Sequence, residues 1–293
     1  MFSLIIENVW RKFNGFCNFW PIVACSNQNS DFTLTKPKIV PVENASCQTL
    51  PDWFPSHLKA INPDFDSRIV CLPDDAQWLQ TSLTGIELRV MELIPGARPR
   101  LALQLRINHE HEPIEIGDHP DLEILIQKGH LSSRIGHYHA NWYYRLPQVN
   151  GDGVPDLEYR RAQSMDPAAP ALMYLAVGQM QQSDTRWRRI NTSDEANWFP
   201  GPVDGTDVLP LHGHGSGNVM LVRWNEMAAF KTRIDPRGEE LLVVKGAVYD
   251  AHGFYPEGTW IRNPIPAWQS WGAKAGTVVY YKNGHFTDSD ALS

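Results

Sequence analysis

The stretch VRWNEMAAFKTRIDPRGEELLVVKG, residues 222–246, decides the fold because the chain carries a second version of it. The earlier version, residues 105–129, reads LRINHEHEPIEIGDHPDLEILIQKG and aligns without a gap at an offset of 117. The identical pairs are Arg106/Arg223, Asn108/Asn225, Asp118/Asp235, Glu123/Glu240, Leu125/Leu242, Lys128/Lys245 and Gly129/Gly246. A repeat of this kind indicates two copies of one domain in the chain.

The repeat extends in both directions from this stretch. GHYHANWYYRLP (136–147) aligns with GFYPEGTWIRNP (253–264), and DDAQW (74–78) matches DEANW (194–198) at a slightly different offset. The insertions fall where loops tolerate them, above all in the long loop predicted at 148–170. The predicted organisation is a leader and packing arm at 1–66, an N-terminal domain at 67–183 and a C-terminal domain at 184–293.

Each copy is predicted to consist of short strands. Segments such as NVMLVRW, EELLVVKGAVY and TVVYYKNG are rich in β-branched and aromatic residues, and Gly, Pro and Asp separate them. The 11 Trp and 22 Pro of the 293-residue chain also favour strands and turns over long helices. Strands of this length and spacing predict an all-β protein built from antiparallel sandwiches or barrels.

Charge and cysteine usage exclude several classes of protein. A net charge of −7 argues against a nucleic-acid-binding surface. The chain contains no run of 18 apolar residues, so no transmembrane helix is predicted. None of the four cysteines forms a CxxC pair, so a zinc ribbon is not expected. We expect a cytoplasmic protein. The alternative is an exported lipoprotein, because IVAC ending at Cys25 is similar to a lipoprotein cleavage site.

Two motifs in the second copy carry a resemblance to a known family. GEELLVVKGAVYDAHGFYPEGTWIRNP (238–264) and VVYYKNGHF (278–286) resemble the ChrR-like cupin family in order and spacing. The resemblance implies a bicupin, that is, two tandem double-stranded β-helix barrels, and a homodimer is plausible by the same resemblance. Relatives include the cupin domain of the anti-sigma factor ChrR and metal-dependent dioxygenases acting on small ketones. The zinc module of the anti-sigma factor carries His-x3-Cys-x2-Cys, which this chain lacks, so sigma-factor binding is not expected.

The resemblance also places the usual cupin metal ligands, His-x-His, then Glu, then a further His. In the second copy these positions fall on Arg233, Asp235, Glu239 and Gln269. Arginine cannot ligate a cation, because its guanidinium stays protonated. In the first copy they fall on Ile116, Asp118, Leu122 and about Asp152, a set that cannot hold a metal in the standard way. The expectation is that neither copy has the standard metal site and that no cofactor is bound.

Charged residues stand where the metal would be in the second copy. Lys231, Arg233 and Asp235 alternate along one predicted strand, so their side chains share one face. If that face is inward, they share the cavity with Glu239. The predicted ligand-binding residues are Lys231, Arg233, Asp235, Glu239, Gln269 and Trp268. The expected function is non-catalytic binding of a small polar or anionic molecule, in a sensing or regulatory role. The alternative is that these charged residues form only a structural salt bridge.

The rival hypothesis is a metal-dependent cupin dioxygenase acting on a small carbonyl or aromatic ketone. It needs an unusual ligand set, and the fallback candidates for Fe, Mn or Zn are His212, His214 and Glu239. HEHEPIE (109–115) also has metal-ligand spacing, but it aligns with the turn before the strand that carries the site. His137 and His139 are likewise interpreted as wall or surface positions.

Aromatic and arginine side chains near the same motifs have competing interpretations. The tryptophans of the second copy suit a ligand wall, but core packing is the simpler role; they are Trp224, Trp260, Trp268 and Trp271. Tyr138/Tyr255 and Arg145/Arg262 recur in both copies. Since only one copy carries a candidate ligand site, we interpret the recurring pairs as parts of the fold.

Overall fold

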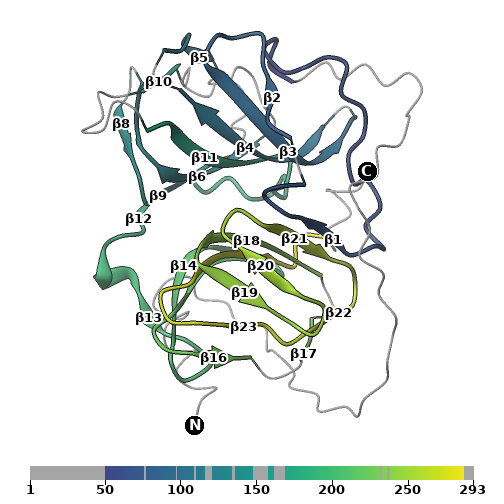
Figure 1. Ribbon diagram of the computed structural model, residues 1–293, viewed down its shortest axis with the longest axis vertical. Helices are drawn as coiled ribbons and strands as arrows, with labels where there is room; N and C mark the ends of the chain where they lie inside the picture. The colour runs from purple at the N-terminus through teal and green to yellow at the C-terminus, as the bar shows by residue number, and fades with distance from the viewer. Residues whose placement is uncertain are drawn as a thin grey trace. The chain divides into compact units, whose positions relative to one another are not determined.

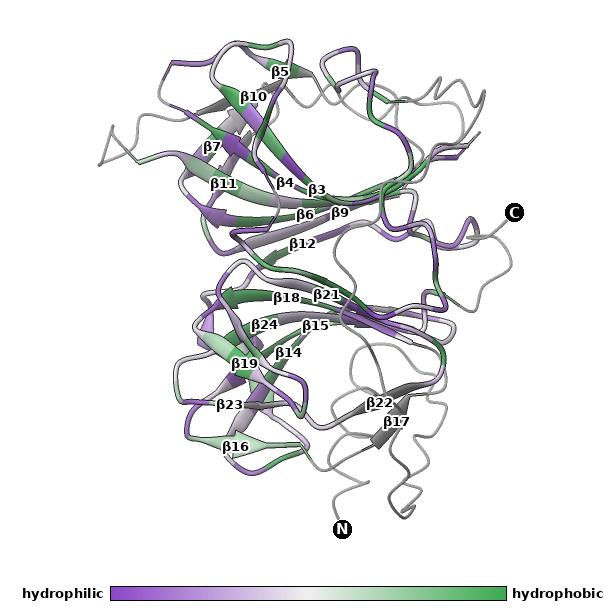
Figure 2. Ribbon diagram, turned by 45° about the vertical axis from the view of Figure 1, so that its right-hand side comes forward, coloured by the Kyte–Doolittle hydropathy of each residue, from purple (hydrophilic) through white to green (hydrophobic). Residues whose placement is uncertain are grey.

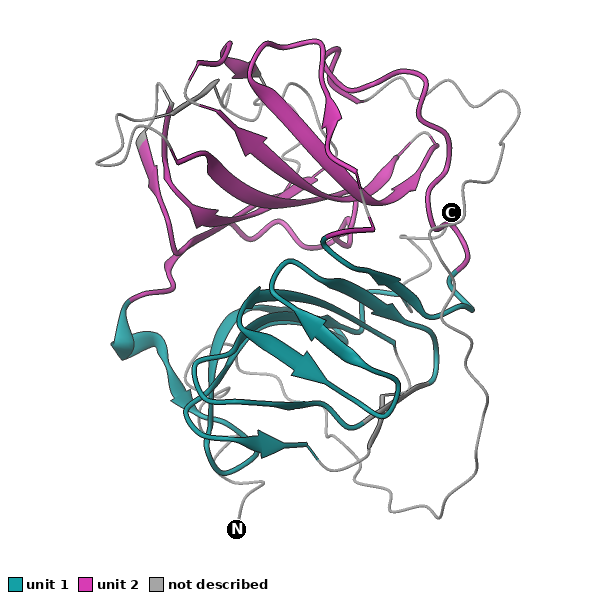
Figure 3. Cartoon of the chain, viewed as in Figure 1, with its two compact units in different colours: residues 1–36, 65–73, 194–288 teal, residues 37–64, 74–193, 289–293 magenta. Residues whose placement is uncertain are grey.

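The chain forms two compact β units, shown in separate colours in Figure 3. The computed structural model describes residues 50–75, 77–96, 98–108, 110–115, 121–133, 136–147, 158–161, 169–230, 233–235 and 238–286. We call the unit that includes residues 74–193 the N-terminal unit; it also takes in residues 50–64. We call the unit that includes residues 194–286 the C-terminal unit; it also takes in residues 65–73.

The N-terminal unit has a seven-stranded and a four-stranded antiparallel sheet (Figure 1). The larger has the order β12 (Arg188–Asn191), β9 (Trp142–Pro147), β6 (Asp121–Lys128), β11 (Ala171–Val177), β4 (Arg100–Ile107), β3 (Ile86–Ile94) and β2 (Leu79–Gln80). The smaller has the order β5 (Ile114–Glu115), β10 (Glu158–Arg161), β7 (His130–Ser133) and β8 (Gly136–His139). Alternate residues of both sheets form one apolar core, to which Trp53 and Phe54 of the preceding segment also belong.

The C-terminal unit repeats this architecture. Its seven-stranded sheet has the order β1 (Ile69–Cys71), β21 (Trp260–Asn263), β18 (Glu239–Lys245), β24 (Val278–Asn283), β15 (Gly217–Trp224), β14 (Thr206–His214) and β13 (Phe199–Pro200). Two smaller sheets are β16 (Ala228–Ala229), β23 (Gly272–Ala273), β19 (Ala247–Tyr249) and β20 (Phe254–Pro256), and β17 (Arg233–Asp235) with β22 (Ala267–Gln269). The 3-10 turn η1 spans Glu195–Asn197. Within the described ranges, no helix is long and apolar enough to cross a membrane.

The two large sheets correspond strand for strand, which confirms the all-β fold in two copies that the strand pattern and the repeat predicted. Reading β12-β9-β6-β11-β4-β3-β2 against β1-β21-β18-β24-β15-β14-β13 pairs every strand with its counterpart in the repeat. The pair β4 and β15 keeps the offset of 117 at both ends, from Arg100 to Gly217 and from Ile107 to Trp224. Local sequence therefore specifies the same strand in both places.

In each large sheet, the edge strand beside β9 or β21 lies outside the stretch of sequence that supplies the other six strands. β1 precedes all the strands of the N-terminal unit in sequence, yet it pairs with β21 of the C-terminal unit, with Val70 opposite Ile261. β12 follows those strands and pairs with β9, with Ile190 opposite Tyr143. If each repeat begins with its own edge strand, the two repeats have exchanged these strands reciprocally.

A repeated arginine contacts the approach to each exchanged strand. Arg145 of β9 forms a 3.0 Å ion pair with Asp184, four residues before β12. Its counterpart Arg262 of β21 stacks over the ring of Phe65 at 4.4 Å, four residues before β1. Both arginines are buried, at 4% and 0% exposed. This arrangement supports the interpretation of Arg145/Arg262 as parts of the fold.

A second repeated cluster explains why DDAQW and DEANW match. In the N-terminal unit, Arg106 lies 4.3 Å over the Trp78 ring and donates to Glu87 at 2.6 Å, while Asn108 donates to the same carboxylate. In the C-terminal unit the same set is Trp198, Arg223, Asp207 and Asn225. The hydrogen bond from Arg106 lowers the pKa of Glu87. Burial acts to raise the pKa of Asp207, but the hydrogen bonds from Arg223 and Asn225 outweigh it.

Glycine ends the strand that carries the candidate site in both copies. Gly129 follows β6 with φ +81, and Gly246 follows β18 with φ +77. A Cβ at Gly246 would lie 2.8 Å from the Thr277 hydroxyl, and one at Gly129 would lie 2.7 Å from Ala171 Cβ. Both the left-handed backbone and the close neighbour require glycine, so this identity of the repeat belongs to the fold.

Candidate functional site

Glu239 occupies the start of β18, at one end of the C-terminal core. It alternates with Leu241 and Val243, which belong to that core, so its side chain lies on the inner face of the sheet. In the ladder it stands opposite Asn263 of β21 and Asn283 of β24. The hydrophobic centre of β18 separates this glutamate from Lys245 at the other end of the strand (Figure 2). The glutamate is fully buried, at 0% exposed.

Three neutral donors hold the Glu239 carboxylate. Oε1 accepts from Trp271 Nε1 at 2.8 Å and from Asn263 Nδ2 at 3.2 Å. Oε2 accepts from the Tyr281 hydroxyl at 2.8 Å. A buried carboxylate is tolerated only when hydrogen bonds replace the water that it loses. These three bonds use both lone pairs of Oε1 and one of Oε2, so at most one lone pair remains for another partner.

A cluster built on an ion pair lies next to this carboxylate cluster. Arg68 Nη2 donates to Asp250 Oδ2 at 2.6 Å and to the Tyr255 hydroxyl at 3.1 Å. The Tyr255 hydroxyl donates in turn to Asp250 Oδ1 at 2.9 Å. Burial raises the pKa of Tyr255 to about 12; the charge of Arg68 opposes this shift, and that of Asp250 adds to it. Arg68 also lies 5.7 Å over the Trp271 ring, and Trp271 therefore links the two clusters.

The sequence contained a signal for part of this site. Asn263 stands two residues after the core residue Ile261, and Tyr281 two residues after Val279, so alternation places both on the inner face with Glu239. Arg68 carried no such signal, because it lies at the start of the first copy and reaches a site of the second copy only through the pairing of β1. Tyr255, interpreted above as part of the fold, is buried beside the Glu239 cluster and hydrogen-bonds the Arg68–Asp250 pair.

The remaining predicted ligand-binding residues lie on β17 and β22. These strands pair with Arg233 opposite Gln269 and Asp235 opposite Ala267, and Trp268 stands opposite Ile234. The backbone therefore brings Arg233 and Gln269 together from positions 36 residues apart in sequence. Lys231 lies outside the described residues, as do the side chains of both strands. A binding role for this group stays a prediction.

Of the residues at the cupin metal positions in the second copy, the structure describes the side chain of Glu239 alone. Among the described residues, no three His, Cys, Asp or Glu side chains gather as a metal site, and the fallback set His212, His214 and Glu239 is not brought together. His212 is buried and His214 half-buried on β14. The Glu239 oxygens are largely committed to Trp271, Asn263 and Tyr281.

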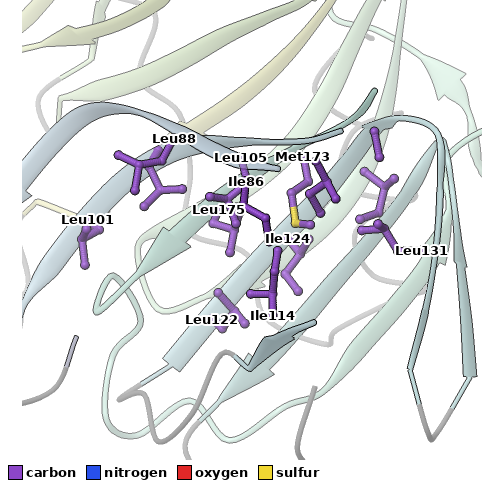
Figure 4. Close-up of a cluster of buried hydrophobic side chains, with 14 of the residues drawn as sticks. Ile86, Leu88, Leu101, Leu105, Ile114, Leu122, Ile124, Leu131, Met173 and Leu175 are labelled. Atoms are coloured by element: carbon purple, nitrogen blue, oxygen red, sulfur yellow. The ribbon is translucent and has the colours of Figure 1, made fainter. Parts of the chain in front are cut away.

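HEHEPIE and the first-copy counterparts of the cupin metal positions do not form a metal site among the described residues. In HEHEPIE, His111 lies in a loop with its Nδ1 2.8 Å from the Glu112 carbonyl oxygen, while His109 lies outside the described residues. The first-copy counterpart of Glu239 is Leu122, which is fully buried among apolar side chains (Figure 4). Ile116, Asp118 and Asp152 lie outside the described part of the chain.

Three of the four discussed tryptophans are buried. Trp224 and Trp271 belong to the C-terminal core, and Trp260 lies on the opposite face of the sheet, where its Nε1 donates to Glu240 at 2.9 Å. Trp271 combines core packing with a polar contact, since its indole nitrogen binds Glu239. The side chain of Trp268 lies outside the described residues.

Comparison with known proteins agrees with this architecture. Residues 187–287 match the ChrR Cupin-like domain model. A search of curated proteins returned no match. The structure is similar to that of protein YlbA from Escherichia coli, with TM-score 0.52 and 8% identity over 75% of this chain and 91% of the other.

Two further solved structures share the fold. A protein provisionally assigned as glyoxylate-induced, from Pseudomonas aeruginosa, has TM-score 0.53 and 10% identity over 83% of this chain and 97% of the other. A protein provisionally assigned as a dioxygenase, from Nostoc punctiforme, has TM-score 0.50 and 13% identity over 74% and 76%. At these identities the likeness concerns the fold alone. The chain has a cupin-like fold, and its residues 187–287 match the ChrR Cupin-like domain.

Proposed function

We propose that the C-terminal cupin unit binds a small polar or anionic molecule without a metal ion, in a sensing or regulatory role. The observation that carries this proposal is the Glu239 carboxylate, which accepts hydrogen bonds from Trp271, Asn263 and Tyr281. A carboxylate held in this way serves as a fixed acceptor within the core. The family's metal-binding function would instead need it as a ligand with free lone pairs.

The predicted ligand contacts come from the β17–β22 pair. Arg233 can present two parallel N–H donors to a carboxylate or phosphate, and Gln269 stands opposite it in the ladder. Lys231 adds a second cation in the sequence, and Trp268 offers a planar wall. The proposed ligand is therefore a small anion or carbonyl compound with a flat or apolar part.

The first experiment combines metal analysis with ligand screening on the full-length, untagged protein. We expect less than about a tenth of an equivalent of Fe, Mn, Ni, Cu or Zn after dialysis against a mild chelator. In a thermal-shift screen of small carboxylates and keto acids, a ligand should stabilise the wild type. Arg233→Ala should raise the dissociation constant of that ligand by at least about tenfold, which corresponds to roughly 1.4 kcal/mol of binding free energy.

A matched control separates binding from general loss of charge. Lys274→Ala removes an exposed cation of the same unit that belongs to neither β17 nor β22, and it should leave the affinity unchanged. Equal loss in Lys274→Ala and Arg233→Ala would refute a specific role for Arg233. Near one equivalent of tightly held metal would instead support a metal-dependent dioxygenase acting on a small carbonyl or aromatic ketone.

A further inference from the structure

Three histidines gather on the hairpin β7–β8 of the N-terminal unit, whereas Glu239 belongs to the C-terminal unit. His130 stands directly opposite His139 in the ladder, and His137 stands two residues before His139. Leu131 and Tyr138, the intervening residues, are buried in the apolar core. Since strand residues alternate between faces, His130, His137 and His139 share the opposite, outward face.

The imidazoles of this cluster are in direct contact. His130 Nδ1 lies 2.9 Å from His139 Nδ1, and the ring centroids are 5.0 Å apart. The centroid of His137 is 6.3 Å from that of His139. His137 and His139 are exposed, and His130 is half-buried. Solvent therefore reaches the cluster. In the Nδ1–Nδ1 hydrogen bond one imidazole donates and the other accepts, so the donor must carry its proton on Nε2 instead before both Nδ1 lone pairs can bind a metal ion.

The equivalent hairpin of the C-terminal unit has no histidine at these positions. At the offset of 117, His130, His137 and His139 correspond to Ala247, Phe254 and Pro256 on β19 and β20. Ala247 pairs with Pro256 in the same register as His130 with His139. The strand pair therefore forms without the imidazoles, and its fold does not explain why the N-terminal copy carries three of them.

We propose that the outward face of β7–β8 binds a divalent transition-metal ion such as Zn²⁺, Cu²⁺ or Ni²⁺, with His130 and His139 as its anchoring ligands and His137 as the third. Two nitrogens that bind zinc at about 2.0–2.1 Å in a tetrahedral shell lie roughly 3.3 Å apart. The Nδ1–Nδ1 distance of 2.9 Å needs to open by only a few tenths of an ångström to reach it.

His137 has further to move than the anchoring pair. No three ligating side chains are gathered around one point among the described residues, so His137 must turn toward the ion from its 6.3 Å ring separation. Its place on the same face, two residues from His139, keeps it within reach by rotation of its own side chain. Water completes the shell, so the site is exposed and distinct in kind from a ligand cavity inside a barrel.

The test is a zinc titration of the full-length, untagged protein, measured by calorimetry after the protein has been treated with chelator and the chelator removed. One ion should bind per chain with a dissociation constant on the order of 1–100 μM. His130→Ala and His139→Ala should each weaken binding by at least about tenfold, and His137→Ala by a similar or smaller factor. With Co²⁺ as probe, a visible absorption band should appear in the wild type and disappear in His139→Ala.

His57→Ala is the matched control, because His57 is an exposed histidine of the same unit outside the hairpin. It should bind zinc like the wild type. Circular dichroism and the unfolding midpoint check that each variant is folded, and His139→Gln replaces His139→Ala if the latter is not. The proposal is overturned if the wild type binds no ion at millimolar zinc, or if the hairpin variants bind as His57→Ala does. Unchanged binding in His137→Ala would overturn its assignment as third ligand.

This site also bears on the metal analysis of the C-terminal unit. The double variant His130→Ala/His139→Ala should lose any zinc held by the hairpin and keep any metal held inside a barrel. Metal content measured on both proteins therefore tells the two proposals apart.

Discussion

At the scale of single residues, Glu239 is the one residue that the second copy shares with the usual cupin ligand pattern, and it is held by neutral hydrogen-bond donors. Its carboxylate accepts three hydrogen bonds inside the core. In Glu239→Gln one acceptor oxygen becomes an amide donor that faces a donor of Trp271 or Tyr281. We expect a loss of about 1.5–3 kcal/mol in the free energy of unfolding, measured by urea titration of tryptophan fluorescence.

The control for this prediction is Glu226→Gln. Glu226 is an exposed glutamate of the same unit, and its substitution should change the unfolding free energy by less than about 0.5 kcal/mol. If both variants unfold at the same urea concentration as the wild type, the Glu239 bonds contribute nothing and the carboxylate is free for another role.

A second residue-scale prediction concerns acid stability. The hydrogen bond from Arg106 lowers the pKa of Glu87 below its ordinary 4.5, so the folded state favours the ionised form. The resulting stabilisation is complete above about pH 5 and disappears as the pH falls through the lowered native pKa. Since both side chains are partly exposed, we expect no more than about 1 kcal/mol.

Urea unfolding at a series of pH values measures this effect. The difference in the free energy of unfolding between the wild type and Glu87→Gln should be largest at neutral pH and should disappear in acid. Glu110→Gln, an exposed substitution in the same unit, should run parallel to the wild type throughout. A gap between the wild type and Glu87→Gln that stays constant with pH would contradict the ion-pair origin.

At the scale of elements, the exchanged strand β12 depends on a buried arginine. Arg145 lies 3.0 Å from Asp184 and 3.4 Å from Glu123, and the Tyr143 hydroxyl donates to Glu123 at 2.9 Å. Arg145→Met removes the cation between two buried carboxylates, so we expect destabilisation of about 3 kcal/mol or more. Hydrogen exchange should show faster amide exchange on β12 and on its neighbour β9.

The control substitution lies on β12 itself. Arg189 is exposed and stacks 4.9 Å over the Trp142 ring, so Arg189→Met should cost less than about 1 kcal/mol and leave β12 protected. Equal effects of the two substitutions would mean that Arg145 has no special part in holding the strand.

At the scale of the whole molecule, the C-terminal unit takes its edge strand β1 from a segment that precedes the strands of the N-terminal unit in sequence. A fragment of residues 184–293 lacks β1, which leaves the edge of β21 unpaired and removes Val70 from the core. Burial of one such side chain contributes about 1.5–3 kcal/mol, so we expect this fragment alone to be markedly less stable than the unit in the full chain.

Complementation tests the exchange directly. Fragments 1–183 and 184–293 should co-purify as a one-to-one complex when they are expressed together, because each supplies the other's missing strand. Fusing residues 65–73 through a flexible linker to residues 194–293 should restore the stability of the C-terminal unit by itself. The exchange would be refuted if 184–293 alone had the same unfolding midpoint as this fusion.

The sequence by itself determined the fold class, the duplication and several positions of the site. Strand alternation depends on neighbouring residues, and an offset of 117 carries the same alternation into both copies. For that reason the strand order of the two large sheets matches, and Glu239 lies on the inner face as its pattern predicts. Arg233 stands opposite Gln269 in the β17–β22 ladder, and their role in a site stays a prediction.

Only the tertiary structure decided which strand completes which sheet and what surrounds Glu239. The edges of the two sheets offer the same backbone donors and acceptors, so nothing in Ile69–Cys71 itself specifies β21 over β9. Arg68 reaches the Trp271 ring through that pairing, across about 200 residues of sequence. The contact between His130 and His139 also follows from strand pairing, because residues nine apart meet only when a hairpin sets them opposite each other.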